Sequence, residues 1–497
     1  MNNVISKESL SQLSEFIASR MGLHFPPERW NDLERNIALA AREFEFNNTE
    51  AFISWLVASK INMEQMEILA SHLTINETYF WREPRVFEAL TEKILPEIIR
   101  LNENGEKRLR IWSAGCATGE EPYSIAIALH RAIPKIEDWN ITILATDINP
   151  RILKKAAAGI YREWSFRDSP GWLKKKYFHV RPDGEFEIDP DIRKMVRFAY
   201  LNLVEDVYPS PVNNTNAMDI IFCRNVLMYF VPGRIKQAAH NLYKSLVEGG
   251  YFMVSAGEFS QELFPQFNSI SFSGAFVYRK DNPGYIPSSD KSIAAESSQN
   301  INIQHQLEQA VLPVFPVLEQ ESISFKILPE TGNLVMPKDA YSEALSLYEE
   351  GQYSETVKKL VETPKTSVTL SVRALANQGK LKEALLLCEK AIIEEKLNPV
   401  LYYLKAAILQ ELNRDEDAII SLKQSLYIDP NLILAHFTLG NIMIKQGSIQ
   451  TAKKDFNNAL ALLGMLKQDD ILPESDGMTA GRFKEILNAT ILTGATA

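Results

Sequence analysis

Residues 109–133, LRIWSAGCATGEEPYSIAIALHRAI, contain the pattern that indicates the fold class. It begins with an apolar run typical of a buried strand and ends with apolar residues at helical spacing. Between the two, Gly115 and Gly119 allow the sharp backbone turn that joins a parallel strand to the helix after it. Strand, turn and helix in this order predict the first unit of an α/β sheet.

The same alternation continues toward residue 280. Strands are predicted at ITILATD, MVRFAYLNL, MDIIFCRN, YFMVSAG and AFVYRK, which are residues 141–147, 195–203, 218–225, 251–257 and 275–280. Helices are predicted at residues 121–133, 149–161 and 233–247. This order is typical of a mainly parallel, Rossmann-like sheet covered by helices. Before it, Leu10, Leu13 and Ile17 recur at helical spacing and predict a small all-α domain.

The chain becomes repetitive beyond residue 339. Ala384, Ala418 and Ala452 are spaced by 34 residues. Further sets keep the same period: Cys388, Leu422 and Phe456; Ala391, Ser425 and Ala459; Ile392, Leu426 and Leu460. Because 34 residues is the tetratricopeptide length, the pattern predicts an all-α solenoid of stacked helix pairs.

These patterns divide the chain into segments. We predict an N-terminal helical domain (1–75), a Rossmann-like domain (76–285), a flexible linker (286–338), a tetratricopeptide domain (339–470) and a C-terminal tail (471–497). The linker is predicted because the sequence around its start, DNPGYIPSSDKSIAAESSQN at 281–300, is rich in Ser, Asn and Pro and has no sustained periodicity.

The composition excludes several classes of protein. A formal net charge of −10 disfavours general binding to nucleic acid or to anionic membranes. Cys116, Cys223 and Cys388 are far apart, which excludes a disulfide framework and a four-cysteine zinc site, and no metal site is expected. No apolar stretch is long enough to insert into a membrane, and the N-terminus does not resemble a signal peptide, so we expect a cytoplasmic protein.

The residues around the glycine turn indicate which ligand it holds. The spacing is not G-x-G-x-x-G and no P-loop lysine follows, while Glu120 and Glu121 would repel a phosphate and attract an ammonium group. Asp147 ends the next strand, where a carboxylate can accept hydrogen bonds from both hydroxyls of a ribose. A ligand with a ribose and an amine but no phosphate is S-adenosylmethionine (AdoMet). The alternative is that the turn holds no AdoMet and is the glycine-rich turn that precedes a helix in any Rossmann-like fold.

Several motifs in succession closely resemble those of CheR-type methyltransferases. They are NETYFWRE at 76–83, SAGCATGEEPYS at 113–124, ATDIN at 145–149, NL at 202–203 and IFCRNVLMYF at 221–230. The resemblance covers about residues 5–280. It implies an N-terminal helical domain, a Rossmann-like catalytic domain and AdoMet bound between them. The implied reaction transfers the methyl group to chemoreceptor glutamates and leaves S-adenosylhomocysteine.

Carried over by position, the resemblance implies a set of site residues. The cofactor-binding residues are Asn76, Thr78, Arg82, Glu121, Asp147, Asn202, Leu203, Arg224 and Asn225. Arg82 and Tyr229 lie nearest the acceptor and are the implied catalytic residues. A glutamate side chain is already ionised at neutral pH, so the transfer needs no general base. Arg82 can orient the incoming carboxylate through its planar guanidinium, and Tyr229 can donate a hydrogen bond.

Simpler explanations exist for some of these residues. Asn76 and Thr78 also suit a helix N-cap, and Arg82 can pair at the surface with Glu83. Asp147 also suits the start of the next helix. Phe80 suits a hydrophobic core as well as a ligand stack, whereas Cys223 is expected to be buried packing.

The chain departs from the family pattern in one region. Family members that dock to a receptor's C-terminal peptide carry a glycine-rich loop in a small β-subdomain, near residues 165–200 here. That region contains Gly184 in its turn but no Gly-x-Gly, so docking of this kind is not favoured. We expect the receptor's cytoplasmic domain as acceptor and a further protein bound by the repeats. The alternatives are a methyltransferase for another acceptor, such as a small metabolite, and a tetratricopeptide adaptor that senses AdoMet.

Overall fold

A computed structural model describes residues 5–59, 61–102, 107–272, 274–280, 338–361 and 368–494. The predicted linker, apart from Lys338, lies outside the described residues. Within those ranges, no helix is both long and apolar enough to cross a membrane.

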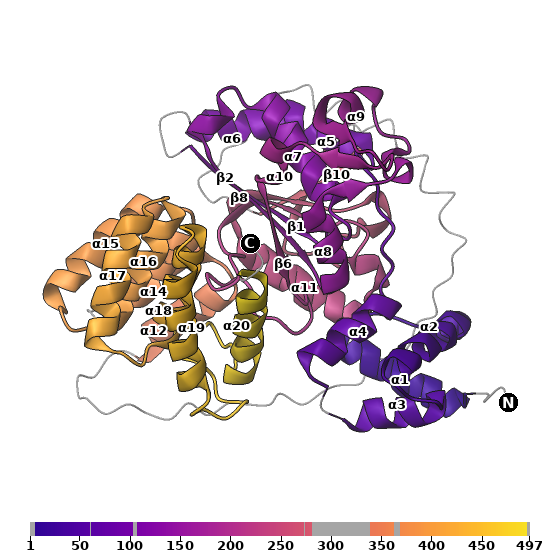
Figure 1. Cartoon of the computed structure of the whole chain (residues 1–497). Helices are drawn as coiled ribbons and strands as arrows, with labels where there is room; N and C mark the ends of the chain where they lie inside the picture. The colour runs from indigo at the N-terminus through magenta and orange to yellow at the C-terminus, as the bar shows by residue number, and fades with distance from the viewer. Residues whose placement is uncertain are drawn as a thin grey trace. The chain divides into compact units, whose positions relative to one another are not determined.

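The N-terminal residues form a four-helix domain with a core of its own (Figure 1). Its helices are α1 (Lys7–Met21), α2 (Trp30–Glu43), α3 (Thr49–Ala58) and α4 (Met63–Leu73). Leu13 and Ile17 of α1 and Leu33 and Ile37 of α2 are fully buried in that core. The helical spacing read from the sequence therefore marks the buried face of these helices.

The middle of the chain folds around a mixed sheet of seven strands in the order β6-β2-β1-β7-β8-β10-β9. The strands are β1 (Arg108–Ala114), β2 (Asn140–Asp147), β6 (Val196–Tyr200), β7 (Met218–Phe222), β8 (Leu246–Met253), β9 (Asn268–Phe272) and β10 (Ala275–Arg279). The first five in spatial order are parallel to one another, and β10 runs antiparallel to both of its neighbours, β8 and β9. The chain builds outward from β1 in one direction through β2 and β6, then returns to β7 on its other side. Such a reversal leaves a crevice at the carboxyl ends of the strands, where α/β proteins bind ligands.

Alternating residues of the strands enter two cores, one on each face of the sheet. Ile111 of β1 lies in one core and Trp112 in the other, and both are fully buried. One core is shared with α7 (Glu120–Ala132), and the other with α11 (Pro232–Ser245). Helix α8 (Pro150–Ala158) lies between β2 and β6 in the chain. The predicted helix–sheet layers are thus confirmed.

Some elements were not predicted as strands or helices. Strand β9 was missed, and so was a small sheet, β3-β5-β4, with strands at Ile160–Tyr161, Phe186–Ile188 and Phe178–Val180. Further short helices are α5 (Pro84–Ala89), α6 (Leu95–Asn102), α9 (Gly171–Tyr177) and α10 (Pro190–Arg193). Helix α8 ends earlier than predicted, because Gly159 adopts a left-handed conformation and caps it.

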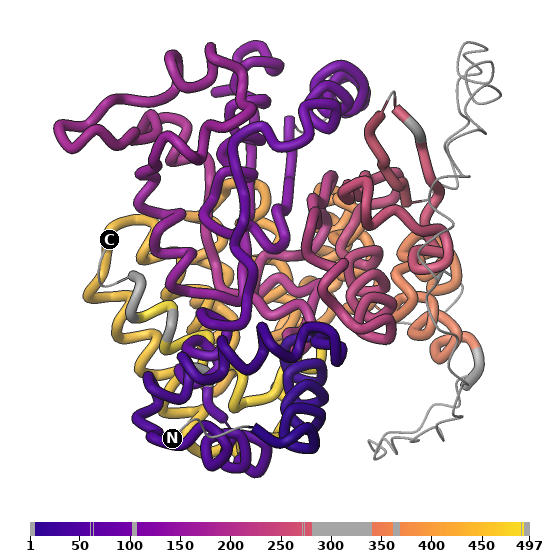
Figure 2. The backbone as a smooth tube through the Cα atoms, turned by 90° about the vertical axis from the view of Figure 1, so that its right-hand side faces the viewer, coloured from indigo at the N-terminus to yellow at the C-terminus, as the bar shows by residue number. Residues whose placement is uncertain are grey.

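The C-terminal helices repeat with the period read from the sequence. They are α12 (Lys338–Glu349), α13 (Tyr353–Val361), α14 (Val368–Asn377), α15 (Leu381–Glu394), α16 (Pro399–Glu411), α17 (Asp415–Ile428), α18 (Ile433–Lys445), α19 (Ile449–Leu463) and α20 (Ala480–Gly494). Helices α15, α17 and α19 begin 34 residues apart. The periodic Ala384, Ala418 and Ala452 are buried within the helical core. The stacked helix pairs are confirmed, and Figure 2 follows their course in orange and yellow.

The residues after the last repeat also join this core. Leu472, Met478, Phe483 and Leu487 are buried among the repeat helices. Helix α20 contacts α19, the second helix of the last repeat pair. The predicted boundary at residue 470 stays a prediction, but these residues supply apolar cover for the end of the solenoid.

Candidate functional site

A cavity that opens to solvent lies at the carboxyl ends of β1, β2 and β7, with a volume of about 990 Å³ that includes the open space at its mouth. The structure brings every predicted site residue to its wall: Asn76, Thr78, Arg82, Glu121, Asp147, Asn202, Leu203, Arg224, Asn225 and Tyr229. Met21 and Leu23, from the end of α1 and just beyond it, complete the wall on the side of the helical domain. The cavity therefore lies between the two domains, at the crevice that the strand order creates.

The turn after β1 requires its glycines. Gly115 has φ +80°, and a Cβ placed there would lie 2.3 Å from Cγ2 of Val226. Gly119 has φ +93°, and its Cβ would lie 2.9 Å from the Cβ of Ala156. Side chains at either position would strain the backbone and collide with neighbouring residues. The backbone of the turn therefore packs closely against its neighbours and forms part of the cavity wall.

Asp147 ends β2 with a buried carboxylate that supports the turn. One oxygen accepts a hydrogen bond from the amide of Ala117, at 3.0 Å, and the other accepts one from the amide of Asn149, at 2.9 Å. Burial raises the pKa of Asp147, and the backbone hydrogen bonds oppose that shift. Helix α8 is capped by Asn149 and not by Asp147, so the simple helix-start explanation is wrong. Each carboxylate oxygen keeps a lone pair for a ligand hydroxyl.

Glu121 and Arg224 form a buried ion pair at the cavity wall. The Nη1 of Arg224 lies 3.0 Å from a Glu121 oxygen, and Ser113 donates a hydrogen bond to the other oxygen at 2.7 Å. Burial raises the pKa of Glu121, and the charge of Arg224 opposes this. The side chain of Arg224 is only 2% exposed and also pairs with Glu83, at 3.2 Å. Arg224 therefore fixes Glu121 in place at the cavity wall.

The segment before α5 lines the cavity with residues 74–79 and with Arg82. The Nη1 of Arg82 donates to the carbonyl oxygen of Glu77, at 2.9 Å, which closes the segment into a loop. Asn76 and Thr78 cap no described helix, since α4 ends at Leu73 and α5 begins at Pro84. The N-cap explanation is thus wrong, and so is an Arg82–Glu83 pair, because Glu83 binds Arg224.

Asn202 and Leu203 lie in the loop after β6. The side-chain nitrogen of Asn202 donates to the carbonyl oxygen of Arg20 at the end of α1, at 2.8 Å, and its oxygen accepts from the amide of Val204, at 3.0 Å. The amide nitrogen therefore ties this loop to the helical domain, and the amide oxygen holds the backbone within the loop. Leu203 is buried and contributes an apolar part of the wall.

Glu258 organises the loop after β7, and sequence reasoning missed it. Its buried carboxylate accepts hydrogen bonds from the amides of Asn225, Val226 and Met228, at 2.7, 2.8 and 3.2 Å. Asn225 has φ +58°, a conformation that non-glycine residues rarely adopt, and the Glu258 bond holds it there. The signal in the sequence was the S-x-x-E capping box at Ser255, which both hydrogen bonds of the structure complete.

Phe80 and Cys223 both belong to the hydrophobic cores. Phe80 is fully buried and stacks on Phe166 with ring centroids 5.0 Å apart, and it does not line the cavity. Its proposed second role as a ligand stack is therefore wrong. Tyr79, its neighbour, lines the cavity instead. Cys223 is fully buried, as expected, and burial raises the pKa of its thiol well above the usual range.

The arrangement fits AdoMet chemically. Asp147 offers two carboxylate oxygens to a diol, and Glu121 places a second carboxylate beside the turn for an ammonium group. Leu203 and Leu201 supply an apolar wall for a flat ring. The donors of Arg82 lie at the same cavity, so an anionic acceptor can approach the bound cofactor.

Comparisons with known proteins agree with this chemistry. The family model described as "CheR methyltransferase, SAM binding domain" matches residues 76–273. Chemotaxis protein methyltransferase 2 of Vibrio cholerae is 32% identical over 56% of this chain and 96% of that protein. Chemotaxis protein methyltransferase of Borreliella burgdorferi is 32% identical over 52% of this chain and 90% of that protein.

Comparison with solved structures matches about a quarter of the chain. MamA from Desulfovibrio magneticus RS-1, residues 41 to the end, aligns with 27% of this chain and 78% of that chain. The two are 21% identical, and the TM-score of 0.25 is too low to support a functional argument.

Proposed function

The chain belongs to the CheR family of AdoMet-dependent methyltransferases, and on this basis we propose that it esterifies glutamate side chains of a chemoreceptor. The observation that carries the proposal is that Arg82 and Tyr229 share one cavity with Asp147 and Glu121. Two relatives that match over nearly their whole length are chemotaxis methyltransferases by name, which supports a receptor as acceptor.

The residues of the chain bind and orient in this reaction. AdoMet, when bound, supplies an electrophilic methyl group. Asp147 holds the ribose hydroxyls, and Glu121 holds the ammonium group of the methionyl end. Arg82 orients the acceptor carboxylate so that one oxygen points at the methyl carbon. Because the carboxylate is already ionised at neutral pH, no residue has to remove a proton.

Arg82 is suited to this role by its surroundings. Its Nη1 binds the Glu77 carbonyl, which limits the positions that the guanidinium can adopt. A guanidinium carries five N–H donors, so donors remain for an acceptor carboxylate. A protein that only sensed AdoMet would have no need for a cation on the acceptor side of the cavity, which disfavours the adaptor alternative.

We also propose that the repeats recruit a protein partner. Leu386 and Ile420 occupy equivalent positions of two successive repeats, and their exposed fractions are 56% and 57%. Ile393 and Tyr427 form a second equivalent pair, with exposed fractions of 70% and 90%. Exposed apolar side chains repeated on neighbouring helices are typical of an interaction surface.

The test is transfer of tritiated methyl groups to a chemoreceptor. The full chain, tritiated AdoMet and membranes containing the receptor should give label that mild base releases as methanol, since carboxylic methyl esters hydrolyse in base. Label on a small molecule and none on protein would favour the metabolite alternative. Binding of AdoMet without any transfer would favour the sensor.

Arg82→Ala tests the acceptor side of the site. Losing a charged hydrogen-bond donor costs about 1.5–3 kcal/mol, so kcat/KM for the receptor should fall roughly 10- to 150-fold. The Kd of S-adenosylhomocysteine should change by less than about threefold on the same reasoning. Arg85→Ala is the matched control, because the Arg85 side chain is 63% exposed and pairs with Glu88 of its own helix. Equal losses in transfer and in binding would mean that Arg82 serves the cofactor alone.

A further inference from the structure

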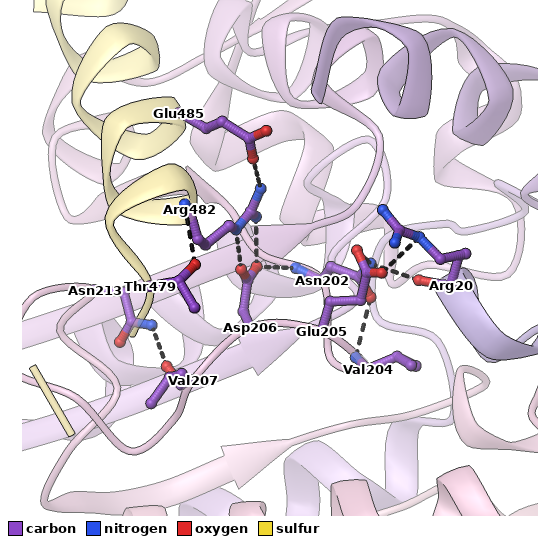
Figure 3. Close-up of polar contacts among 10 residues, drawn as sticks. All are labelled: Arg20, Asn202, Val204, Glu205, Asp206, Val207, Asn213, Thr479, Arg482 and Glu485. Atoms are coloured by element: carbon purple, nitrogen blue, oxygen red, sulfur yellow. Dashed lines mark hydrogen bonds and ion pairs between the residues drawn. The ribbon is translucent and has the colours of Figure 1, made fainter. Parts of the chain in front are cut away.

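A residue of the C-terminal helix α20 reaches the loop that lines the cofactor cavity. Arg482 forms a two-point ion pair with Asp206, and its Nη2 lies 2.9 Å from Oδ2 (Figure 3). The two side chains are 17% and 4% exposed, so the pair is largely withdrawn from water. The guanidinium carbon of Arg482 also lies over the ring of Tyr200, 5.1 Å from its centroid.

Asp206 links Arg482 directly to Asn202, a residue of the cavity wall. The same Oδ2 that binds Arg482 accepts a hydrogen bond from the backbone amide of Asn202, at 2.6 Å. The Asn202 side chain in turn binds the carbonyl oxygen of Arg20, and Glu205 pairs with the Arg20 side chain at 2.7 Å. Figure 3 shows this chain of contacts running from α20 to the end of α1. The loop 202–206 is therefore held from both sides, by α1 and by α20.

The repeats make a second contact at Asn216, so residues 206–216 are held at both ends. The side chain of Glu411, at the end of α16, lies 3.1 Å from Arg108 and accepts a hydrogen bond from Asn216, at 2.7 Å. Val207 and Val212, between the two contacts, pack against the core of the repeats. The repeats thus cover the outer side of residues 206–216, while Asn202 and Leu203 line the cavity.

We infer that Arg482 is a positioning residue for cofactor binding, through which the C-terminal repeats fix the loop Asn202–Asp206. Without Arg482, Asp206 is a buried carboxylate that pairs with no other cation in the part of the chain that the structure describes, and such a charge moves toward water or draws water in. Either response displaces the amide of Asn202 and the Leu203 wall. The inference rests on the proposed placement of AdoMet in this cavity.

The experiment measures AdoMet affinity and turnover in the full chain. Arg482→Ala should raise the Kd of AdoMet roughly 2- to 30-fold, the usual range for coupling through packed side chains. The kcat at saturating AdoMet and the KM for the receptor should stay within about twofold on the same reasoning, because Arg482 touches neither acceptor nor Arg82. Arg482→Lys keeps the charge and should recover part of the affinity. Arg414→Ala, which removes an exposed arginine of the same domain, should change nothing.

Each outcome decides between the alternatives. A folded Arg482→Ala protein with an unchanged AdoMet Kd overturns the inference. If that variant does not fold, Arg482→Lys takes its place, and wild-type AdoMet affinity together with a lost ion pair overturns it. Equal losses in kcat and AdoMet affinity indicate general damage and also overturn it. Asp147→Ala is measured in parallel, and unchanged AdoMet affinity there overturns the placement of the cofactor itself.

Discussion

Replacing Glu258 by glutamine tests whether one buried carboxylate holds the wall of the cofactor cavity. Oxygen Oε2 accepts bonds from the amides of Asn225 and Ser255 and from the Ser255 hydroxyl, at 2.7, 3.1 and 2.6 Å. Oxygen Oε1 accepts bonds from the amides of Val226 and Met228. Glutamine keeps the shape of the side chain but replaces one acceptor by an NH₂ donor.

The size of the effect follows from these contacts. In either orientation of the amide, two backbone N–H groups face a donor and lose their partner. An unsatisfied buried group costs about 1–3 kcal/mol, so the free energy of unfolding should fall by about 2–6 kcal/mol. AdoMet affinity should fall as well, because Asn225 and Val226 line the cavity and Asn225 has left-handed dihedral angles.

Urea unfolding and calorimetric titration with AdoMet measure the two effects. Titrations are made at a temperature at which both proteins are folded, so that stability and affinity are read separately. Glu262→Gln, an exposed position four residues further on, is the matched control and should stay within about 0.5 kcal/mol. If Glu258→Gln falls within the range of that control, Glu258 does not hold the loop and the reasoning is refuted.

Two further predictions concern Asp147 and Lys280. Asp147→Ala should weaken AdoMet binding by about 1–3 kcal/mol in calorimetry, whereas the exposed Asp138→Ala should not. Lys280 is buried against Tyr243 and Tyr353, and burial lowers its pKa from 10.5 to about 7, so the folded state binds fewer protons than the unfolded state between those values. Stability should therefore rise with pH by up to about 1.4 kcal/mol per pH unit in that window, relative to Lys280→Met. Parallel slopes for the two proteins in urea unfolding at pH 7.5–9.5 would contradict the second prediction.

The sequence predicted the elements whose residues carry their own pattern. The apolar runs of β1, β2 and β7 and the 34-residue period of α15, α17 and α19 reflect burial that repeats along the chain. Strand β9, NSISF, alternates polar and apolar residues only over its last four positions, Ser269–Phe272. A run of that length does not distinguish a strand from a loop.

The sequence predicted the site residues whose side chains lie at the ends of strands. It missed Glu258, whose partners are backbone amides. Asp147 ends one buried strand and Arg224 lies just after another, where ligands bind, so their position alone suggested a role. Glu258 binds backbone amides of a loop some thirty residues away in sequence. A pattern of side chains cannot indicate that a residue binds backbone amides, because amides are present at every residue except proline.

The contacts of the C-terminal repeats with the rest of the chain were also beyond sequence reasoning. Glu411 and Arg482 are ordinary surface residues by composition, and only their partners, Arg108 and Asp206, give them a structural role. The sequence alone led us to expect repeats on a flexible tether that act only by recruitment. A tether alone would leave Arg108 and Asp206 facing water, and the structure buries both.

The two roles of the repeats use different residues and are therefore compatible. Glu411 contacts Arg108 and Arg482 contacts Asp206. The side chains of Leu386, Ile393 and Tyr427, in contrast, are exposed. A partner bound at the exposed side chains would not have to displace the contacts at Arg482. Conversely, a partner that shifts α20 by even a small amount would weaken the Arg482–Asp206 pair and with it the Asn202 loop. Because coupling between sites is reciprocal, AdoMet binding would then change the affinity for that partner by the same factor.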